Sequence, residues 1–488
     1  MAPPNEPAAV GVVRFSSLHD VPASFVEANG ATDPLAPRPG TLSRLHKSLS
    51  TFSSSTSLLP HSSSCTFQEP TGTWFQGCYY LVATVGAPFT LSLPNAFARL
   101  GWAGGTTTVL VAYLATLWCA TRMAHLHEFG GVRRTRYRDL GVAVLGPRLG
   151  RALVTCLQLV VNTGMCTIYP VICGQALQGA YTALCGLRAG THCLPSLSPW
   201  IAGFSGAQLL LVVLPDIASL APVQAAGALT TLGFCFLAVL GCILHGRDAD
   251  VSYAIAGSVA GRLFPAFSAL GSITLLFGNT VLVETQAVLA ARPSAVPPMR
   301  RAALVGYTVI CALVLAVVLS GYWAFGAGVD SLVFNSIRHP IWLVVLGNFL
   351  LVGNGLAGYL MFAHSVFDWV DTRIALAHWT GLEYRDSWAV IAKRLSFRWA
   401  FVAATGFLAV ALPFITDLMG LVGSVGYAPL CFILPCVMWM MARGAALRRW
   451  ERALCLLIAA LFVLVGLLAA VGSAWSIVDH ATSYAFFS

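Results

Sequence analysis

The sequence predicts an all-helical protein that crosses a membrane many times. Hydrophobic residues make up 57% of the 488 residues and charged residues only 10%, and the mean hydropathy is +0.77. Apolar segments of about 18 residues or more recur along the chain, and each is long enough to cross the hydrocarbon core as a helix. These observations exclude a soluble protein with a large core. The net charge of +9 therefore concerns membrane topology, and no nucleic-acid partner is expected.

Two regions follow from the change in composition along the chain. Residues 1–70 are rich in Pro and Ser and poor in aromatic residues, with serine runs at 53–55 and 62–64. Such a segment buries too little apolar surface to fold, so we expect a disordered cytoplasmic tail. It has no apolar stretch behind a basic start, and no cleaved signal peptide is expected. Residues 71–488 form the predicted transmembrane domain.

Hydropathy divides the second region into eleven predicted spans. Their expected limits are 74–98, 104–126, 150–184, 199–215, 222–245, 262–290, 301–325, 340–367, 397–413, 418–442 and 453–474. With the N-terminus in the cytoplasm, only five of the 28 Lys and Arg residues lie outside. These five are Arg99, Arg188, Arg247, Arg262 and Arg338. Because cytoplasmic loops carry the excess of basic residues, this bias predicts a cytoplasmic N-terminus and an extracellular C-terminus.

The first predicted span is not suited to a continuous helix. Gly86, Ala87 and Pro88 lie together in its middle, and Pro94 follows. Proline removes a backbone donor and glycine adds backbone freedom, so the helix should break here. In hydrocarbon the freed backbone groups must face protein, ligand or water. The break indicates either a substrate site of the kind found in secondary transporters or a proline kink without a ligand.

The sixth predicted span repeats this irregularity. Its middle reads Phe277-Gly278-Asn279-Thr280, and Glu284 follows four residues later. An acid within a span normally faces the bundle interior or water, where burial favours its neutral, proton-carrying form. Glu284 is therefore a candidate for proton coupling, with a structural role near the helix end as the alternative. If spans 1–5 and 6–10 are two halves of opposite orientation, the two breaks occupy corresponding places, as in inverted-repeat transporters.

The 14 cysteines show no metal-ligand spacing, so no metal site and no cofactor are expected. Cys185 and Cys193 bracket a short polar loop, and they form a disulfide if that loop faces an oxidising compartment. No nucleophile elbow or phosphate-binding loop occurs either, so an enzyme is not expected.

Several short motifs resemble the amino acid/auxin permease family of the amino acid–polyamine–organocation superfamily, and in particular its plant lysine/histidine transporter-like group. The motifs are Leu91-Ser92-Leu93-Pro94, Leu100-Gly101-Trp102, Tyr137-Arg138-Asp139-Leu140-Gly141, Leu214-Pro215-Asp216, Val283-Glu284-Thr285-Gln286-Ala287, Gly321-Tyr322-Trp323-Ala324-Phe325-Gly326, Val366-Phe367-Asp368, Tyr427-Ala428-Pro429, Leu434-Pro435-Cys436 and Phe486-Phe487-Ser488. They run in order from about residue 70 to the end. The resemblance implies a LeuT-type 5+5 inverted repeat with broken helices 1 and 6 and one additional C-terminal helix.

The resemblance also implies a substrate site and an activity. Import of amino acids with protons across the plasma membrane is expected, with the substrate between the first and sixth helices and the third and eighth completing the pocket. Backbone N–H groups at the first break would meet the substrate carboxylate, and carbonyls at the second would meet its ammonium group. The expected substrate-binding residues are Val85, Gly86, Ala87, Pro88, Phe89, Thr90, Asn162, Phe277, Gly278, Asn279, Thr280 and Asn354.

Three departures from the family pattern bear on the substrate. The first break holds Pro88 and Phe89 instead of further glycines, Gly-Asn-Thr replaces Gly-His-Asn in the sixth helix, and Asn162 stands where lysine/histidine permeases carry an acid. Without that acid a cationic side chain loses a partner, so neutral or broad specificity is expected. An auxin or organic-acid carrier and a non-transporting amino acid sensor remain the alternatives. The expected partners are an amino acid and the lipid bilayer, with no obligate protein partner.

Overall fold

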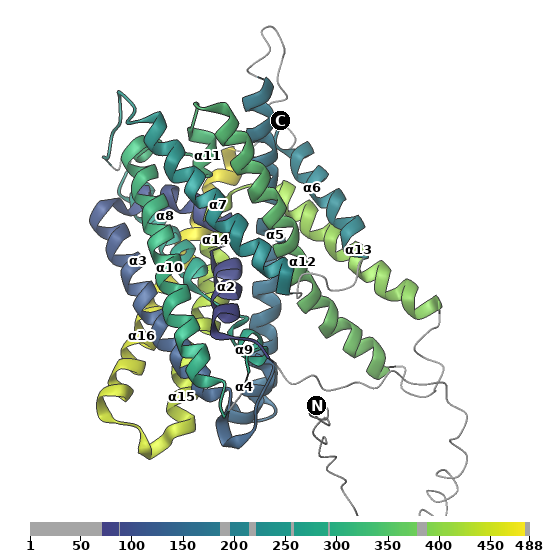
Figure 1. Cartoon of the computed structure of the whole chain (residues 1–488). Coiled ribbons are helices and arrows are strands. Elements are labelled where there is room, and N and C mark those ends of the chain that lie inside the picture. The colour runs from purple at the N-terminus through teal and green to yellow at the C-terminus, as the bar shows by residue number, and fades with distance from the viewer. Residues whose placement is uncertain are drawn as a thin grey trace, which may run out of the picture. The chain divides into compact units, whose positions relative to one another are not determined.

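The computed structural model describes residues 71–86, 88–185, 196–213, 221–254, 258–290, 293–377 and 388–483. The chain divides into residues 1–68 and 69–488, and all the described residues belong to the second part. The regular elements in these ranges are helices that run side by side as a bundle (Figure 1). The longer ones are α2 (Trp74–Val85), α3 (Leu93–Leu126), α4 (Tyr137–Leu145), α5 (Leu149–Cys185), α6 (Ser198–Leu211), α7 (Ala221–His245), α8 (Val259–Phe277), α10 (Val296–Phe325), α12 (Ile341–Ala377), α13 (Trp388–Ala411), α14 (Ile415–Val422), α15 (Leu434–Arg443) and α16 (Arg449–Ser483). The predicted tail at residues 1–70 lies outside the described residues.

Within the described ranges, nine helical stretches are long and apolar enough to cross a membrane. This confirms a polytopic membrane protein, whereas the count of eleven is not reached. The predicted first span is divided between α2, a 3-10 turn and the start of α3, and the predicted span 199–215 appears as α6, which has only 14 residues. A helix needs about 20 residues to cross the hydrocarbon core. The eleven-span count therefore stays a prediction.

The predicted break in the first span is confirmed. Helix α2 ends at Val85, and after Gly86 a 3-10 turn, η2 (Pro88–Ser92), leads into α3. Pro94 stands in the first turn of α3, where its missing N–H would have no helical partner. Within α3, Gly101 has a φ of 71° and a ψ of 176°, which are not helical values, so this element consists of two helices joined across a kink. Only glycine adopts such a positive φ readily, and the kink lies between the first two predicted spans, 74–98 and 104–126.

The predicted break in the sixth span is also confirmed. Helix α8 ends at Phe277, and the chain resumes helical geometry only in the short helix α9 (Leu282–Ala287). The end of α9 is fixed by Arg133, whose Nη2 donates to the carbonyls of Gln286, Ala287 and Leu289 at 3.0, 3.0 and 2.7 Å. A guanidinium group at this position satisfies the orphan carbonyls of the helix C-terminus.

A third irregular segment was not predicted. Between α14 and α15 the chain forms a π-helical segment, η6 (Gly423–Ile433), with Pro429 inside it. Proline has no N–H to donate to the preceding turn, which favours a wider helical turn at this point. Glycines allow η6 and α14 to approach α8 closely, because a side chain at Gly420 or Gly423 would collide with the backbone of α8. The irregular segment therefore lies against the helix that carries the second break.

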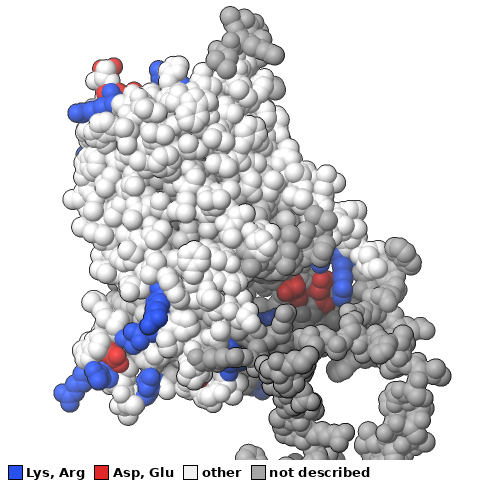
Figure 2. Space-filling view, viewed as in Figure 1, with Lys and Arg blue, Asp and Glu red and all other residues white. Residues whose placement is uncertain are grey.

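Charged residues mark the two ends of the bundle. Figure 2 shows a broad uncharged band, with Lys and Arg mostly toward the lower end of the visible face. The lower end carries α4 and the turn between α15 and α16 (Figure 1), and these segments contain Arg136, Arg138, Arg443 and Arg449. We call it the arginine-rich end. The band between the ends has the character of a lipid-facing surface.

The opposite end contains a buried polar cluster. Asp417 in α14 has a side chain that is only 2% exposed, and its Oδ1 lies 2.8 Å from Arg99 of α3. The same oxygen accepts a hydrogen bond from Ser268 of α8 at 2.9 Å, and Oδ2 lies 3.1 Å from His480 of α16. One carboxylate thus joins four helices. We call Arg99, Ser268, Asp417 and His480 the Asp417 cluster.

Candidate functional site

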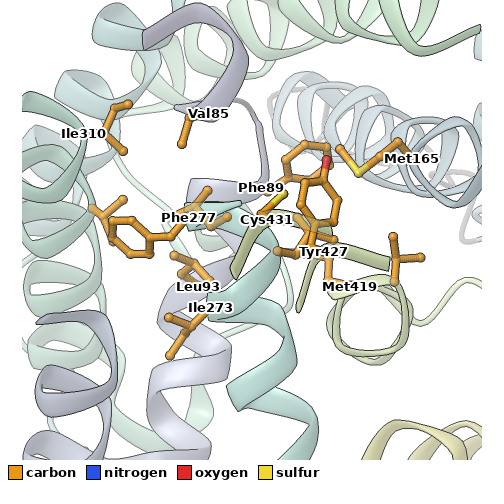
Figure 3. Packing of buried hydrophobic residues seen from close by; sticks show 14 of the residues in the cluster. Val85, Phe89, Leu93, Met165, Ile273, Phe277, Ile310, Met419, Tyr427 and Cys431 are labelled. Carbon is orange, nitrogen blue, oxygen red and sulfur yellow. The ribbon is translucent and has the colours of Figure 1, made fainter. Parts of the chain in front are cut away.

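The three irregular segments meet in the core of the bundle. A side chain at Gly278 would collide with the ring of Tyr427 in η6, so this ring covers the second break. Phe89 in η2 packs edge-on against Tyr169 of α5, with ring centroids 5.0 Å apart. Figure 3 shows Phe89 and Tyr427 close together, with Met165 beside them. The two breaks therefore face each other across a layer of buried aromatic rings.

The first break is closely packed and leaves two polar atoms unsatisfied. Gly86 donates to the carbonyl of Val82 at 3.0 Å, and a side chain there would collide with Thr231 of α7. Every residue of η2 is buried. The hydroxyl oxygens of Thr90 and Ser92 are buried and have no hydrogen-bond partner among the described residues. Ala87, another predicted site residue, lies outside the described ranges.

The second break has part of its backbone already engaged. The carbonyl of Phe277 accepts a hydrogen bond from Thr116 of α3 at 3.1 Å, which leaves one lone pair of this oxygen for a substrate ammonium group. Gly278 donates to the carbonyl of Thr274 at 3.0 Å. The side-chain oxygen of Asn279 accepts from the N–H of Val281 at 2.9 Å, an arrangement that fixes the turn before α9.

There is little empty space at the second break in this conformation. A cavity of about 20 Å³ is bordered by Asn279, Thr280 and the rings of Tyr137 and Tyr307. A water needs about 10–15 Å³ of such volume, so the cavity is large enough for a water molecule and too small for an amino acid. Admission of a substrate to the second break therefore requires the surrounding side chains to move.

A larger polar cavity lies toward the arginine-rich end. It has a volume of about 170 Å³ and brings together two of the predicted residues, Asn162 and Glu284. Asn162 on α5 is only 8% exposed, and it is therefore polar lining deep in the bundle. Arg136 and Arg138 of α4 line the same cavity.

Glu284 connects the second break to this cavity. Its Oε1 accepts a hydrogen bond from the N–H of Tyr137 at 3.2 Å, so the carboxylate caps the start of α4, where the helix dipole favours a negative charge. Its Oε2 is buried and makes no hydrogen bond to any described residue. The Tyr137 hydroxyl in turn donates to the carbonyl of Leu430 in η6 at 2.6 Å. The carboxylate is therefore coupled to η6 through a single residue.

Asn354 is placed apart from the other predicted residues. Its Nδ2 donates to the carbonyl of Gly227 at 3.0 Å and lies 3.0 and 3.2 Å from the hydroxyls of Thr230 and Thr231, all on α7. Because Thr231 also packs against Gly86, Asn354 contacts the first break indirectly, through α7. Val85 and Phe277 are buried apolar residues, 3% and 0% exposed.

Four further residues at the breaks were not predicted as site residues from the sequence: Thr116, Tyr169, Tyr307 and Tyr427. Tyr169 precedes Pro170 within α5 and Tyr427 lies two residues before Pro429. A proline within a span is the signal that could have directed attention to both. Thr116 and Tyr307 belong to regular helices, and only the tertiary structure reveals them. For the predicted disulfide, Cys185 is disulfide-bonded, but Cys193 lies outside the described residues, so the pairing stays a prediction.

Interrupted helices that meet in the bundle core, beside a carboxylate and a polar cavity, are the features of a membrane transporter. Comparison with protein families agrees. Residues 70–478 match the model of the transmembrane amino acid transporter protein family, and the chain belongs to that family.

Individual relatives extend over most of the chain. It is 34% identical to lysine histidine transporter-like 6 of Arabidopsis thaliana over 86% of this chain and 94% of the relative. Lysine histidine transporter-like 1 of the same plant is 30% identical over 85% of this chain and 90% of the relative. GABA transporter 1 is 26% identical over 86% and 93%. The predicted family is thereby confirmed, and the protein is an integral membrane transporter of the amino acid transporter family.

Proposed function

We propose that this protein imports neutral amino acids, or a broad range of them, together with protons by alternating access. The observation that carries the proposal is the position of Glu284. It lies just beyond the second break, caps α4 through one oxygen and leaves the other without a hydrogen-bond partner among the described residues. A carboxyl group in this position can bind and release a proton close to the substrate.

The substrate's polar groups are matched by atoms at the two breaks. The hydroxyls of Thr90 and Ser92 are available as donors to a carboxylate. Pro88 has no N–H, so side-chain hydroxyls take the place of one backbone donor. The second lone pair of the Phe277 carbonyl is available to an ammonium group.

The packing around the breaks supports neutral over strictly cationic substrates. Phe89 packs against the ring of Tyr169, and Tyr427 and Met165 lie beside Phe89 (Figure 3). Asn162 supplies no charge. A lysine side chain among these groups would bury its ammonium without a carboxylate partner, which costs several kcal/mol.

The architecture that we propose has eleven spans, with the breaks in spans 1 and 6 of a LeuT-type inverted repeat and an added eleventh span. The N-terminus is cytoplasmic, the C-terminus is extracellular, and the plasma membrane is the proposed location. The arginine-rich end supports this orientation. The cavity at Glu284 is then on the cytoplasmic side, where a proton carried inward can leave.

The test is uptake in yeast cells that lack their own amino acid permeases. Labelled amino acids are supplied at pH 5 and pH 7.5 to cells expressing the wild type or Glu284→Gln. Saturable wild-type uptake is expected to be several-fold faster at pH 5. Because glutamine is permanently neutral and still accepts from Tyr137, Glu284→Gln should reach the surface and show the same rate at both pH values.

Asp250→Asn is the control, because this carboxylate is exposed in the turn between α7 and α8 and away from the Glu284 cavity. It should keep the wild-type pH dependence. If uptake by Glu284→Gln still depends on pH, Glu284 does not couple protons to transport, and its role is to cap α4. Protein at the surface that binds amino acids without uptake would favour a sensor, and uptake of indole-3-acetate without competition by amino acids would favour an organic-acid carrier.

A further inference from the structure

The larger cavity has walls of both charges. The 170 Å³ space is enclosed by residues of α4, α5, α9 and α12, and no single helix supplies it. Its lining residues are Arg136, Arg138, Thr155, Gln158, Leu159, Asn162, Glu284, Ser365, Asp368 and Trp369. The lining thus includes two arginines, two acids, two amides and two hydroxyls, and Nε of Arg138 also lies 3.8 Å from Oδ1 of Asp139, outside the lining. This balance is unusual inside a membrane bundle, where each charge is expensive to keep.

Two buried polar atoms at this cavity lack hydrogen-bond partners in the part of the chain that the structure describes. Oε2 of Glu284 and Oγ1 of Thr155 are both buried and have no hydrogen-bond partner among the described residues. Buried polar groups are nearly always hydrogen-bonded, and an exception calls for a water or a ligand. A carboxylate oxygen accepts hydrogen bonds only, so its missing partner is a donor.

The distribution of charge defines which ligand fits. Arg136 and Arg138 stand at the start of α4, where arginine forks and the helix dipole both favour a carboxylate. Glu284 and Asp368 offer acceptors for an ammonium group. A simple anion would be repelled by the two acids and a simple cation by the two arginines. A zwitterion satisfies both.

We propose that this cavity is a second amino acid site, occupied after the substrate leaves the space between the two breaks. The α-carboxylate contacts Arg136 and Arg138, the α-ammonium contacts Glu284 and Asp368, and a neutral side chain lies against Leu159 and Trp369. Gln158 and Asn162 hydrogen-bond the bound molecule. The proposal rests on the proposed function, because it assigns a second position to the same substrate.

Such a site lengthens the path on the arginine-rich side. Once Glu284 has lost its proton, its carboxylate attracts the ammonium of an arriving amino acid. Glu284 thereby connects the two sites, because it adjoins the second break along the chain and lines the cavity. Arg138 and Gln158 belong to the second site alone.

The experiment counts bound amino acid molecules. Full-length protein is purified in nanodiscs and titrated to saturation with tritiated leucine, and the same variants are assayed for leucine uptake in yeast. The wild type is expected to bind two molecules per chain. Arg138→Gln and Gln158→Leu are each expected to bind one, with the site between the breaks intact. Asp250→Asn, at an exposed residue in the turn between α7 and α8, is expected to bind two.

The outcomes separate the two proposals. Wild-type protein that transports leucine but binds one molecule per chain would overturn the second site and leave the proposed function in place. Two bound molecules in both Arg138→Gln and Gln158→Leu would overturn the assigned position. Neither uptake nor binding of leucine in the wild type would contradict both proposals.

Discussion

Gly278 passes directly beneath the ring of Tyr427 at the second break, and the contact leaves no room for a side chain. We predict that Gly278→Ala lowers uptake at least tenfold, because the added methyl group must push the ring or the backbone aside, and overpacking of a closed core costs about 1–3 kcal/mol. Initial rates of labelled amino acid uptake, normalised to surface protein, measure the effect.

The second variant of this experiment is Gly278→Ala combined with Tyr427→Ala. Removal of the ring makes space for the methyl group, so the double variant should recover part of the rate that the single variant loses. Gly328→Ala is the control, because no atom lies within 4 Å of a side chain placed there, and it should transport normally. If the uptake rate of the double variant falls by the product of the two single-variant reductions, the ring and the glycine act independently.

At the scale of elements, the Asp417 cluster joins α3, α8, α14 and α16 through one buried carboxylate. We predict that Asp417→Asn destabilises the protein by about 1–3 kcal/mol, because Arg99 loses its charged partner within the bundle. The measurement is the midpoint of thermal unfolding in detergent, which should fall by several degrees. Asp250→Asn, in the exposed turn between α7 and α8, should not shift it, and an unchanged midpoint for Asp417→Asn would contradict the role of the cluster.

Some elements of the structure can be predicted from the local sequence alone, and others depend on tertiary contacts. Both breaks were predictable, because glycine, proline and short polar residues act on their own stretch of backbone. The short helix α4 was recognised only as a motif, and its position depends on Glu284 of a distant helix. The π-helical segment η6 depends in part on close contact with α8. Hydropathy does not contain such tertiary information.

The candidate site divides in the same way. The breaks were predicted from their glycine, proline and small polar residues, but Thr116, Tyr169, Tyr307 and Tyr427 approach them only in the folded bundle. Asn354 stays a predicted binding residue, and in this conformation its side chain hydrogen-bonds α7. A polar residue in a span has both uses, and only its partners distinguish them.

For the whole molecule, the uneven distribution of arginine predicts how the bundle is oriented. The turn between α15 and α16 belongs to the arginine-rich end, whereas the turn after α7 belongs to the opposite end (Figure 1). Because basic residues are retained on the cytoplasmic side during insertion, the first turn should face the cytoplasm and the second the outside. Ala446 and Asp250 are exposed residues in these two turns.

Single cysteines at these positions test the orientation. With the exposed Cys156 replaced by serine, Asp250→Cys should react with a membrane-impermeant maleimide in intact cells, and Ala446→Cys only after permeabilisation. The native described cysteines other than Cys156 and the disulfide-bonded Cys185 are buried, so background labelling should be low. The reverse pattern would place the arginine-rich end and Glu284's cavity outside. Proton release from that cavity into the cytoplasm would then be impossible, so the same experiment also tests the direction of the proposed transport.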